Sequence, residues 1–287
     1  IYDTAYSQSL IKRILKDMDL DEKKFTPRSM LSAISAAKNA AILPEKYLEE
    51  AGQDLWKKTV GQVYMEYRKR MLQADAMDFD DLLLYTVLLL ENSSEAREYY
   101  QRRFRYVLVD EYQDTNILQY RLVHLLAGER QNLCVVGDDD QGIYKFRGAT
   151  IQNILDFEKD YPGARVIKLE QNYRSTGTIL DAANAVIREN RGRKGKTLWT
   201  DNERGEVITL FTAVSENDEA QYIAGRILAD ISAGGNYRDH AVLYRVNALS
   251  NRLEYALKRN GIPYRIYGGT RVYSRAGVTD TRAALCA

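Results

Sequence analysis

The chain has 287 residues, and its 41 Lys plus Arg against 40 Asp plus Glu give a net charge of +1, which excludes a uniformly basic nucleic-acid coat. Hydrophobic residues make up 45% and charged residues 28%, which is typical of a folded chain and excludes disorder. Two cysteines are too few for a disulfide framework or a zinc cluster, and they fit a reducing compartment.

The N-terminal part of the sequence predicts helices without an intervening strand. Apolar residues from Leu10 to Met18 recur at three- and four-residue spacing. Thr26 before Pro27 predicts a helix start, with Thr as N-cap and Pro at the first helical position. Two further helices are predicted over residues 45–73 and 80–91. The longest apolar run lies in the second of these and is far shorter than the roughly 20 residues of a membrane span.

The pattern then changes to short apolar runs alternating with helices. Runs at 106–109, 133–136 and 165–169 predict strands, and the helices between them are predicted at 117–126 and 151–157. This alternation is typical of an α/β domain with a parallel sheet. Ligands of such sheets bind outside the carboxyl ends of the strands, so the polar residues after each run should converge on one crevice.

A second α/β stretch follows the first. Ser215 with Asp218 three residues later predicts a capping box, and Gly261 predicts the end of a later helix. The predicted elements are helices at 178–188, 216–231 and 249–258 and strands at 206–211, 240–244 and 264–267.

The first chemical motif is Asp110-Glu-Tyr-Gln-Asp-Thr-Asn116, directly after a predicted strand. Adjacent carboxylates in this position suit nucleotide hydrolysis. Asp110 would hold Mg²⁺, and Glu111 would orient or deprotonate the attacking water. A bare Asp-Glu pair is more often a solvated acidic loop, but the whole heptapeptide is far more specific.

The second motif runs from Val135 to Ala149 and contains three successive aspartates. Three like charges repel one another unless a cation or a basic partner lies nearby. Gln141 offers a neutral amide that suits contact with a γ-phosphate. Two rings and a guanidinium within four residues suit base stacking and phosphate contact, at Tyr144, Phe146 and Arg147.

The third motif is Asn172-Tyr-Arg-Ser175. Arg174 is a candidate arginine finger that neutralises charge on the transferred phosphoryl group. Tyr173 is a candidate for stacking on a nucleobase. Without the other two motifs, this tetrapeptide would be better interpreted as a surface segment with an exposed arginine.

In their order and in their residues, the three motifs resemble those of the superfamily-one DNA helicases of the UvrD/Rep/PcrA family. The resemblance extends over nearly the whole chain, including Met77-Asp-Phe-Asp-Asp-Leu82 and Leu243-Tyr-Arg-Val-Asn-Ala248. It implies an α/β fold of RecA-like parallel-sheet domains, of the P-loop NTPase type, with an N-terminal all-helical insertion.

The resemblance also implies roles for individual residues. Asp110 and Glu111 would be the metal residues, with Glu111 also catalytic. Gln141 would couple the γ-phosphate to the DNA site, Tyr173 would stack near adenine, and Arg174 would approach the γ-phosphate. The residues implied to contact single-stranded DNA are Tyr144, Phe146 and Arg147, with Arg245 and Asn247 from the second domain.

The implied cofactors are ATP and Mg²⁺, and the implied partners are single-stranded DNA and junctions of single- and double-stranded DNA. Repair or replication proteins are left open as partners, and no membrane is involved. The implied location is the bacterial cytoplasm, at the nucleoid. The implied activity is ATP-driven 3′-to-5′ translocation with duplex unwinding.

The sequence departs from the family pattern in three places. Gly142 stands where the family usually has Ser, and Phe146 where it often has Trp. No phosphate-binding loop of the form G-x-x-x-x-G-K-S/T occurs. Gly195-Lys196-Thr197 has the wrong glycine spacing and follows a predicted helix, so it is interpreted as a basic linker or surface loop.

We therefore expect an internal piece of a helicase that is inactive alone. The expected parts are a helical insertion at 1–77, the back half of the first RecA-like domain at 78–168, the first part of the second at 169–273, and the start of a further subdomain at 274–287. Two alternatives stay open. One is a helicase-nuclease subunit of the RecB/AddA type, and the other is a non-catalytic DNA- or protein-binding module derived from a helicase.

Overall fold

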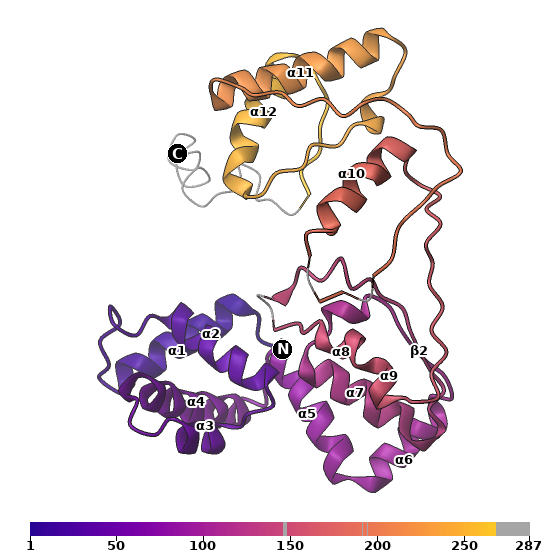
Figure 1. The fold of residues 1–287 in the computed structure, drawn as a ribbon. Coiled ribbons are helices and arrows are strands. Elements are labelled where there is room, and N and C mark those ends of the chain that lie inside the picture. Colours follow the sequence, from indigo (N-terminus) through magenta and orange to yellow (C-terminus); the bar gives the residue numbers. More distant parts are fainter. Residues whose placement is uncertain (146–147, 191, 194, 268–287) are drawn as a thin grey trace. The chain divides into compact units, whose positions relative to one another are not determined.

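The computed structural model describes residues 1–145, 148–190, 192–193 and 195–267. The chain forms two compact units, residues 1–205 and residues 206–287. Figure 1 shows the elements along the chain. The expected segment 274–287 lies outside the described residues.

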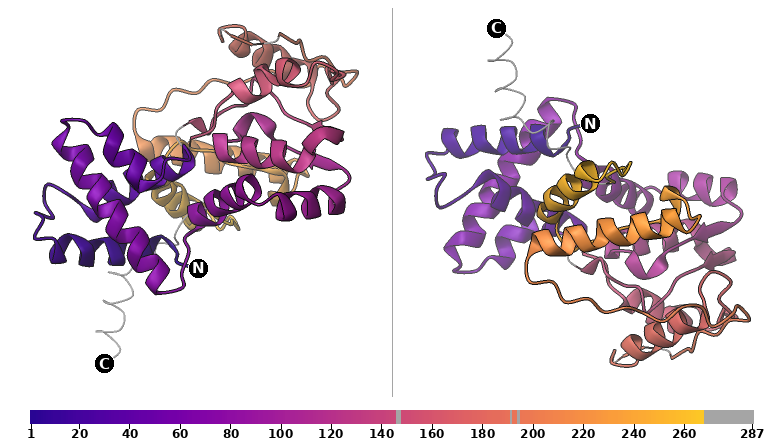
Figure 2. Two further views of the ribbon diagram at one scale, coloured as in Figure 1. Left: turned by 90° about the horizontal axis from the view of Figure 1, so that it is seen from below. Right: turned by 90° about the horizontal axis from the view of Figure 1, so that it is seen from above.

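The N-terminal part of the first unit is a group of four helices that lie together in every view (Figures 1 and 2). Apolar side chains of α1, α2 and α4 form its core, where Ile11, Ile14 and Ile34 are fully buried. The predicted start of α2 is confirmed, because Thr26 accepts a hydrogen bond from the Ser29 amide at 3.2 Å. The helices are α1 (Thr4–Asp17), α2 (Pro27–Asn39), α3 (Pro44–Glu50) and α4 (Leu55–Gln73).

The single helix predicted over 45–73 is wrong, because the chain breaks between α3 and α4. Gly52 has a φ of +54°, in the left-handed region that favours glycine. Asp54 then caps α4 by accepting from the Lys57 amide at 3.0 Å. The apolar periodicity continues across this turn, but the local capping signals decide the boundary.

A buried ion cluster joins α2 to α5 (Phe79–Asn92), the first helix after the four-helix group. The Lys38 ammonium lies 2.7 Å from a carboxylate oxygen of Asp78 and 2.7 Å from one of Asp81. The two aspartates also form a reciprocal capping box at the start of α5. Tyr67 of α4 donates its hydroxyl to Asp78 at 2.9 Å. The cluster therefore links the four-helix group to the rest of the unit.

The α/β part contains a two-stranded parallel sheet, which confirms the predicted α/β class. β1 (Val107–Val109) pairs with β2 (Leu133–Val135) in the register Val107–Leu133 and Val109–Val135. A small core of Leu84, Val87 and Leu118 packs α5 against α7. The neighbouring helices are α6 (Ser94–Arg103), which the sequence pattern does not indicate, and α7 (Ile117–Ala127).

Four predicted strands are wrong, at 165–169, 206–211, 240–244 and 264–267. Over the described residues, β1 and β2 form the only ladder. A strand requires a hydrogen-bonded neighbour, and these apolar runs have none there. Their side chains are accordingly exposed, with Leu169 at 78%, Leu210 at 91% and Leu243 at 94%.

The remaining helices largely follow the predictions. The helix predicted at 151–157 divides into two short ones, while α10 and the two helices of the second unit lie within one or two residues of their predicted limits. The helices are α8 (Gln152–Leu155), α9 (Phe157–Asp160), α10 (Gly177–Ile187), α11 (Glu216–Ser232) and α12 (Ser250–Arg259), with 3-10 turns at Tyr112–Asp114, Gly128–Arg130, Tyr237–Asp239 and Asn247–Leu249.

In the second unit, α11 and α12 pack through a core that includes Ala224, Ala256 and Leu257. Ser215 caps α11 as predicted, by accepting from the Asp218 amide at 3.2 Å. Asp218 differs from the expectation, because its carboxylate accepts from the amide of Val214 rather than from that of Ser215.

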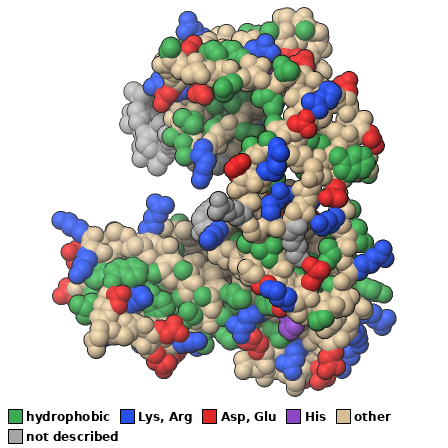
Figure 3. All heavy atoms as spheres, viewed as in Figure 1, with side chains coloured by type: hydrophobic (Ala, Val, Ile, Leu, Met, Phe, Trp, Pro, Cys, Tyr) green, Lys and Arg blue, Asp and Glu red, His purple; other side chains and the backbone are tan. Residues whose placement is uncertain are grey.

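Apolar side chains also reach the surface of the molecule in several places (Figure 3). None of the helices in the described part of the chain combines the length and the hydrophobicity that crossing a membrane requires.

Candidate nucleotide-hydrolysis site

Asp110 and Glu111 follow the carboxyl end of β1, as the sequence predicts. Both are exposed. A carboxylate oxygen of Asp110 accepts from the Glu111 amide at 2.9 Å. Glu111 has φ +50° and ψ +42°, a left-handed conformation that costs a non-glycine residue about 1–2 kcal/mol. The chain therefore turns sharply at Glu111, and the surrounding contacts must maintain this turn.

Gln113 provides the main contact to the Glu111 side chain. It lies in the 3-10 turn after Glu111 and is 1% exposed. Its side-chain amide donates to a Glu111 carboxylate oxygen at 2.7 Å, and its carbonyl oxygen accepts from the Asp138 amide at 3.0 Å. One buried side chain thus joins the end of β1 to the loop after β2.

Helix α8 anchors the segment that follows this turn. Asn153 of this helix donates to both the carbonyl and the hydroxyl oxygen of Thr115, at 3.2 and 3.0 Å. The Thr150 amide donates to the same carbonyl at 3.1 Å. The Asn153 and Thr115 side chains are buried, so these contacts restrict the path of the chain just after the two carboxylates.

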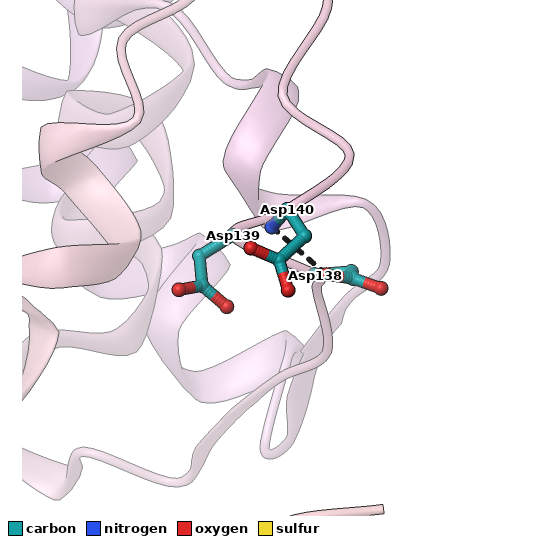
Figure 4. Close-up of side chains that lie close together, drawn as sticks. All are labelled: Asp138, Asp139 and Asp140. Atoms are coloured by element: carbon teal, nitrogen blue, oxygen red, sulfur yellow. Dashed lines mark hydrogen bonds between the residues drawn. The ribbon is translucent and has the colours of Figure 1, made fainter. Parts of the chain in front are cut away.

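The loop after β2 carries Asp138, Asp139 and Asp140 on consecutive positions (Figure 4). Their carboxylate oxygens lie within 4.8 Å of one another, close enough to share a cation. Lys196 pairs with Asp138 and also lies 3.8 Å from Asp139, and Arg193 lies 2.6 Å from Asp140. The chain itself therefore supplies the basic partner that three adjacent aspartates require.

These contacts change the interpretation of the basic segment. The sequence pattern assigns Lys196 to a linker or surface loop, but its side chain is only 17% exposed because the aspartates surround it. The rejection of a phosphate-binding loop at Gly195-Lys196-Thr197 still agrees with the structure, since no helix follows this segment before residue 206. Arg191 and Lys194 of the segment lie outside the described residues.

Asp138 connects this ion cluster to Gln141. Burial raises the pKa of Asp138, but hydrogen bonds from Lys196, Gln141 and the Asp140 amide outweigh it and leave that pKa below its ordinary value. Gln141 is exposed and donates its side-chain amide to Asp138 at 2.8 Å. Asp138 therefore stays ionised and orients the Gln141 side chain.

The residues after β1 fit a magnesium ion by their chemistry. Mg²⁺ takes oxygen ligands and is usually bound through one or two carboxylates, with water completing its shell. Asp110 and Glu111 offer two exposed carboxylates, and the Asp110 oxygen that accepts from the Glu111 amide leaves its second oxygen for a ligand.

Tyr173 and Arg174 lie elsewhere in the first unit, after the extended segment that precedes α10. Tyr173 is 80% exposed, and its hydroxyl donates to Gln171 at 2.8 Å. Arg174 is also exposed. Among the described residues, no hydrogen bond or ion pair joins Arg174 to Asp110, Glu111 or Gln141. In the described part of the chain, the hydrogen bonds thus connect Glu111 with Gln141 through Gln113 and Asp138, and they do not include Arg174.

The residues predicted to contact DNA are distributed over both units. Tyr144 is 37% exposed in the loop after β2. Phe146 and Arg147 lie outside the described residues. Arg245 and Asn247 belong to the second unit, where both are exposed and Asn247 begins a 3-10 turn.

The sequence alone does not identify two contributors to this site. Gln113 lies inside the first motif, but only the tertiary contacts show that its amide connects two loops. Lys196 is recognisably basic, and the need of the three aspartates for a cation is the signal that could link it to Asp138, 58 residues away.

Comparison with known proteins matches the sequence of the chain to the models of one helicase family. The UvrD/REP helicase N-terminal domain matches residues 1–162, and the UvrD-like helicase C-terminal domain matches residues 167–286. The ATP-dependent DNA helicase PcrA of Bacillus subtilis is 50% identical over 286 residues, which cover 99% of this chain and 39% of the relative.

The PcrA helicases of Staphylococcus aureus and Staphylococcus epidermidis are 49% and 48% identical, each over 280 residues that cover 98% of this chain and 38% of the relative. The chain thus spans about two fifths of the length of these relatives. With the motif order and the carboxylates after β1, these matches show that the chain belongs to the UvrD/REP helicase family.

Proposed function

We propose that the chain is part of an ATP-dependent DNA helicase that moves 3′ to 5′ along single-stranded DNA and unwinds duplex DNA. The names of the relatives support a DNA helicase. The observation that carries the proposal is the connection of the Glu111 carboxylate, through Gln113, to the loop that holds Gln141. This connection joins a candidate hydrolysis residue to a candidate phosphate sensor.

The proposed chemistry divides the work between neighbouring residues. Asp110 holds Mg²⁺, which when bound neutralises charge on the phosphates. Glu111 orients the attacking water and accepts its proton. Gln141 contacts the γ-phosphate, Tyr173 stacks on adenine, and Arg174 stabilises charge on the transferred phosphoryl group.

The proposed DNA contacts come from both units. Tyr144, Phe146 and Arg147 provide rings and a charge for bases and phosphates, and Arg245 and Asn247 add contacts from the second unit. Single-stranded DNA and its junctions with duplex are the proposed substrates, and the cytoplasm, at the nucleoid, is the proposed location.

The proposed organisation assigns residues 1–77 to a helical insertion, 78–168 and 169–273 to parts of two RecA-like domains, and 274–287 to a further subdomain. The chain on its own is proposed to be inactive. It contains no G-x-x-x-x-G-K-S/T loop, and Lys196 of its only Gly-Lys-Thr segment is paired with aspartates.

The test compares Asp110→Asn and Glu111→Gln in the longer protein of which we propose this chain to be a part. Asp110→Asn should weaken Mg²⁺-dependent nucleotide binding as well as hydrolysis. Glu111→Gln should retain ATP binding but slow single-turnover hydrolysis about 10²–10⁴-fold, because it removes a general base.

Glu98→Gln is the matched control, since Glu98 is an exposed acid of α6 whose basic partner, Arg102, lies 3.7 Å away on the same helix. It should hydrolyse ATP at the unmodified rate. Hydrolysis by Glu111→Gln at that same rate would contradict the catalytic assignment and show that the two carboxylates form only an acidic loop.

A further inference from the structure

Gln113 lies between the two halves of the proposed hydrolysis site. Its orientation is determined by its neighbours, because the Glu111 carboxylate only accepts hydrogen bonds and the Asp138 amide only donates one. The side-chain NH₂ group therefore faces Glu111 at 2.7 Å, and the side-chain oxygen faces Asp138 at 3.0 Å. Of the amino acids of this length, only glutamine offers both a donor and an acceptor without a change of protonation.

The packing around the Gln113 side chain leaves it little freedom to move away from Glu111 and Asp138. The side chain is 1% exposed. A Cβ atom at Gly137 would lie 2.6 Å from its oxygen and 2.8 Å from Cδ1 of Ile154. The loop after β2 therefore approaches Gln113 as closely as it does only because residue 137 is glycine.

The contacts continue from Asp138 to the phosphate sensor. Asp138 accepts from the Gln141 side chain at 2.8 Å with one carboxylate oxygen and from Lys196 with the other. The Gln141 amide also donates to the Asp138 carbonyl at 2.9 Å. An uninterrupted series of hydrogen bonds thus runs from Glu111 through Gln113 and Asp138 to Gln141.

We infer that Gln113 is a positioning residue that holds the Glu111 carboxylate and the 138–141 loop in one register, so that ATP hydrolysis and its stimulation by DNA both depend on it. This inference rests on the proposed function, in which Gln113 touches neither nucleotide nor DNA. Gln113 acts by fixing where the Glu111 carboxylate points and by transmitting a displacement of the loop to that carboxylate.

Two substitutions separate the contacts of Gln113. Gln113→Met retains much of the volume but loses both hydrogen bonds. Gln113→Glu keeps an acceptor for the Asp138 amide but places a second carboxylate against Glu111. Misplacing a catalytic group by about 1 Å costs on the order of 10²-fold. In the longer protein, both variants should lower kcat about 10–100-fold while KM and binding of a non-hydrolysable ATP analogue stay close to the unmodified values.

DNA stimulation distinguishes positioning from simple loss of stability. The ratio of kcat with and without single-stranded DNA should fall toward one in Gln113→Met, where the link to the loop is lost. If both variants unfold at lower temperature but keep the unmodified kcat and DNA stimulation in the cold, Gln113 is only a packing residue and the inference is wrong.

A second measurement needs no ATP and uses the 287-residue chain itself. A carboxylate polarises a bonded amide more than a neutral acceptor does, and hydrogen bonds in series influence one another. Glu111→Gln should therefore shift the ¹⁵N amide resonance of Asp138, and this response should disappear in a Gln113→Met background. Glu98→Gln should leave the resonance in place. A shift that persists without Gln113 would overturn the inference.

The two proposals fail in different ways. If Glu111→Gln hydrolyses ATP normally, the proposed function fails. If Glu111→Gln is inactive while both Gln113 variants hydrolyse ATP normally with full DNA stimulation, the proposed function stands and the positioning role is wrong.

Discussion

Removal of Lys38 should strongly destabilise the first unit. Its ammonium makes 2.7 Å contacts with both Asp78 and Asp81, and the three side chains are 3%, 10% and 4% exposed. The ammonium also lies 5.0 Å from the centre of the Tyr67 ring. Lys38→Met keeps the apolar stem but leaves two buried carboxylates without their cation. Removing one partner from a buried ion pair typically costs about 3–5 kcal/mol.

For a unit of this size, that loss corresponds to a fall of about 6–20 °C in Tm. Urea unfolding followed by circular dichroism measures the free energy directly. Lys46→Met is the matched control, since Lys46 lies 3.7 Å from Glu50 with both side chains more than half exposed. An exposed pair of this kind contributes less than about 1 kcal/mol.

The pH dependence tests whether charge causes the loss. Burial raises the pKa of Asp78, but the charge and hydrogen bond of Lys38 outweigh it, so that pKa is lowered in the folded chain. Asp78 therefore adds stability above its unfolded pKa, and this contribution is lost as the pH falls through the lowered value. Burial also raises the pKa of Asp81, and there Lys38 compensates only in part.

Without Lys38, burial dominates at both aspartates, so both folded pKa values should lie above the unfolded ones. Ionisation of the pair then opposes folding at neutral pH, and protonation relieves this cost as the pH falls. The difference in unfolding free energy between Lys38→Met and the unmodified chain should be largest near neutral pH and should narrow on acidification. An equal difference at every pH would show that packing, not charge, accounts for the loss.

Two further predictions concern the loop after β2 and the proposed DNA contacts. Gly137→Ala should lower the unfolding free energy by about 1–3 kcal/mol, because its Cβ would overlap Gln113 and Ile154. Gly163→Ala is the control, since nothing lies within 4 Å of its added Cβ. Equal effects of the two substitutions in urea unfolding would refute the steric argument. The unmodified chain should bind single-stranded DNA weakly, and its affinity should fall as the salt concentration rises. Fluorescence anisotropy over a salt series measures this affinity. Binding to duplex DNA alone, or an affinity independent of salt, would contradict the proposed DNA contacts.

The sequence determined most of the helices, because their signals are local. The apolar spacing of α1 and the Thr26-Pro27 start of α2 involve residues within one or two turns of each other. The same holds for the position of Asp110 and Glu111 at the end of a strand, since an apolar run followed by two acids is visible in six residues.

Strands and ion pairs depended on the tertiary structure, because their partners lie far away along the chain. The run at 165–169 has the composition of a strand, but composition does not supply the neighbour that its backbone needs. Lys196 pairs with Asp138 across 58 positions, and Lys38 pairs with Asp78 across 40. The periodicity of apolar residues along the sequence does not indicate a contact between residues so far apart.

Gln113 illustrates the division most clearly. The sequence places it two residues after Glu111, but a glutamine there is equally compatible with a solvated loop. Its role follows from the tertiary structure. Gly137 allows the loop after β2 to approach Gln113 within hydrogen-bonding distance, so the Gln113 amide is buried between Glu111 and Asp138. A buried amide must bond its neighbours on both sides, and only the folded chain decides which neighbours those are.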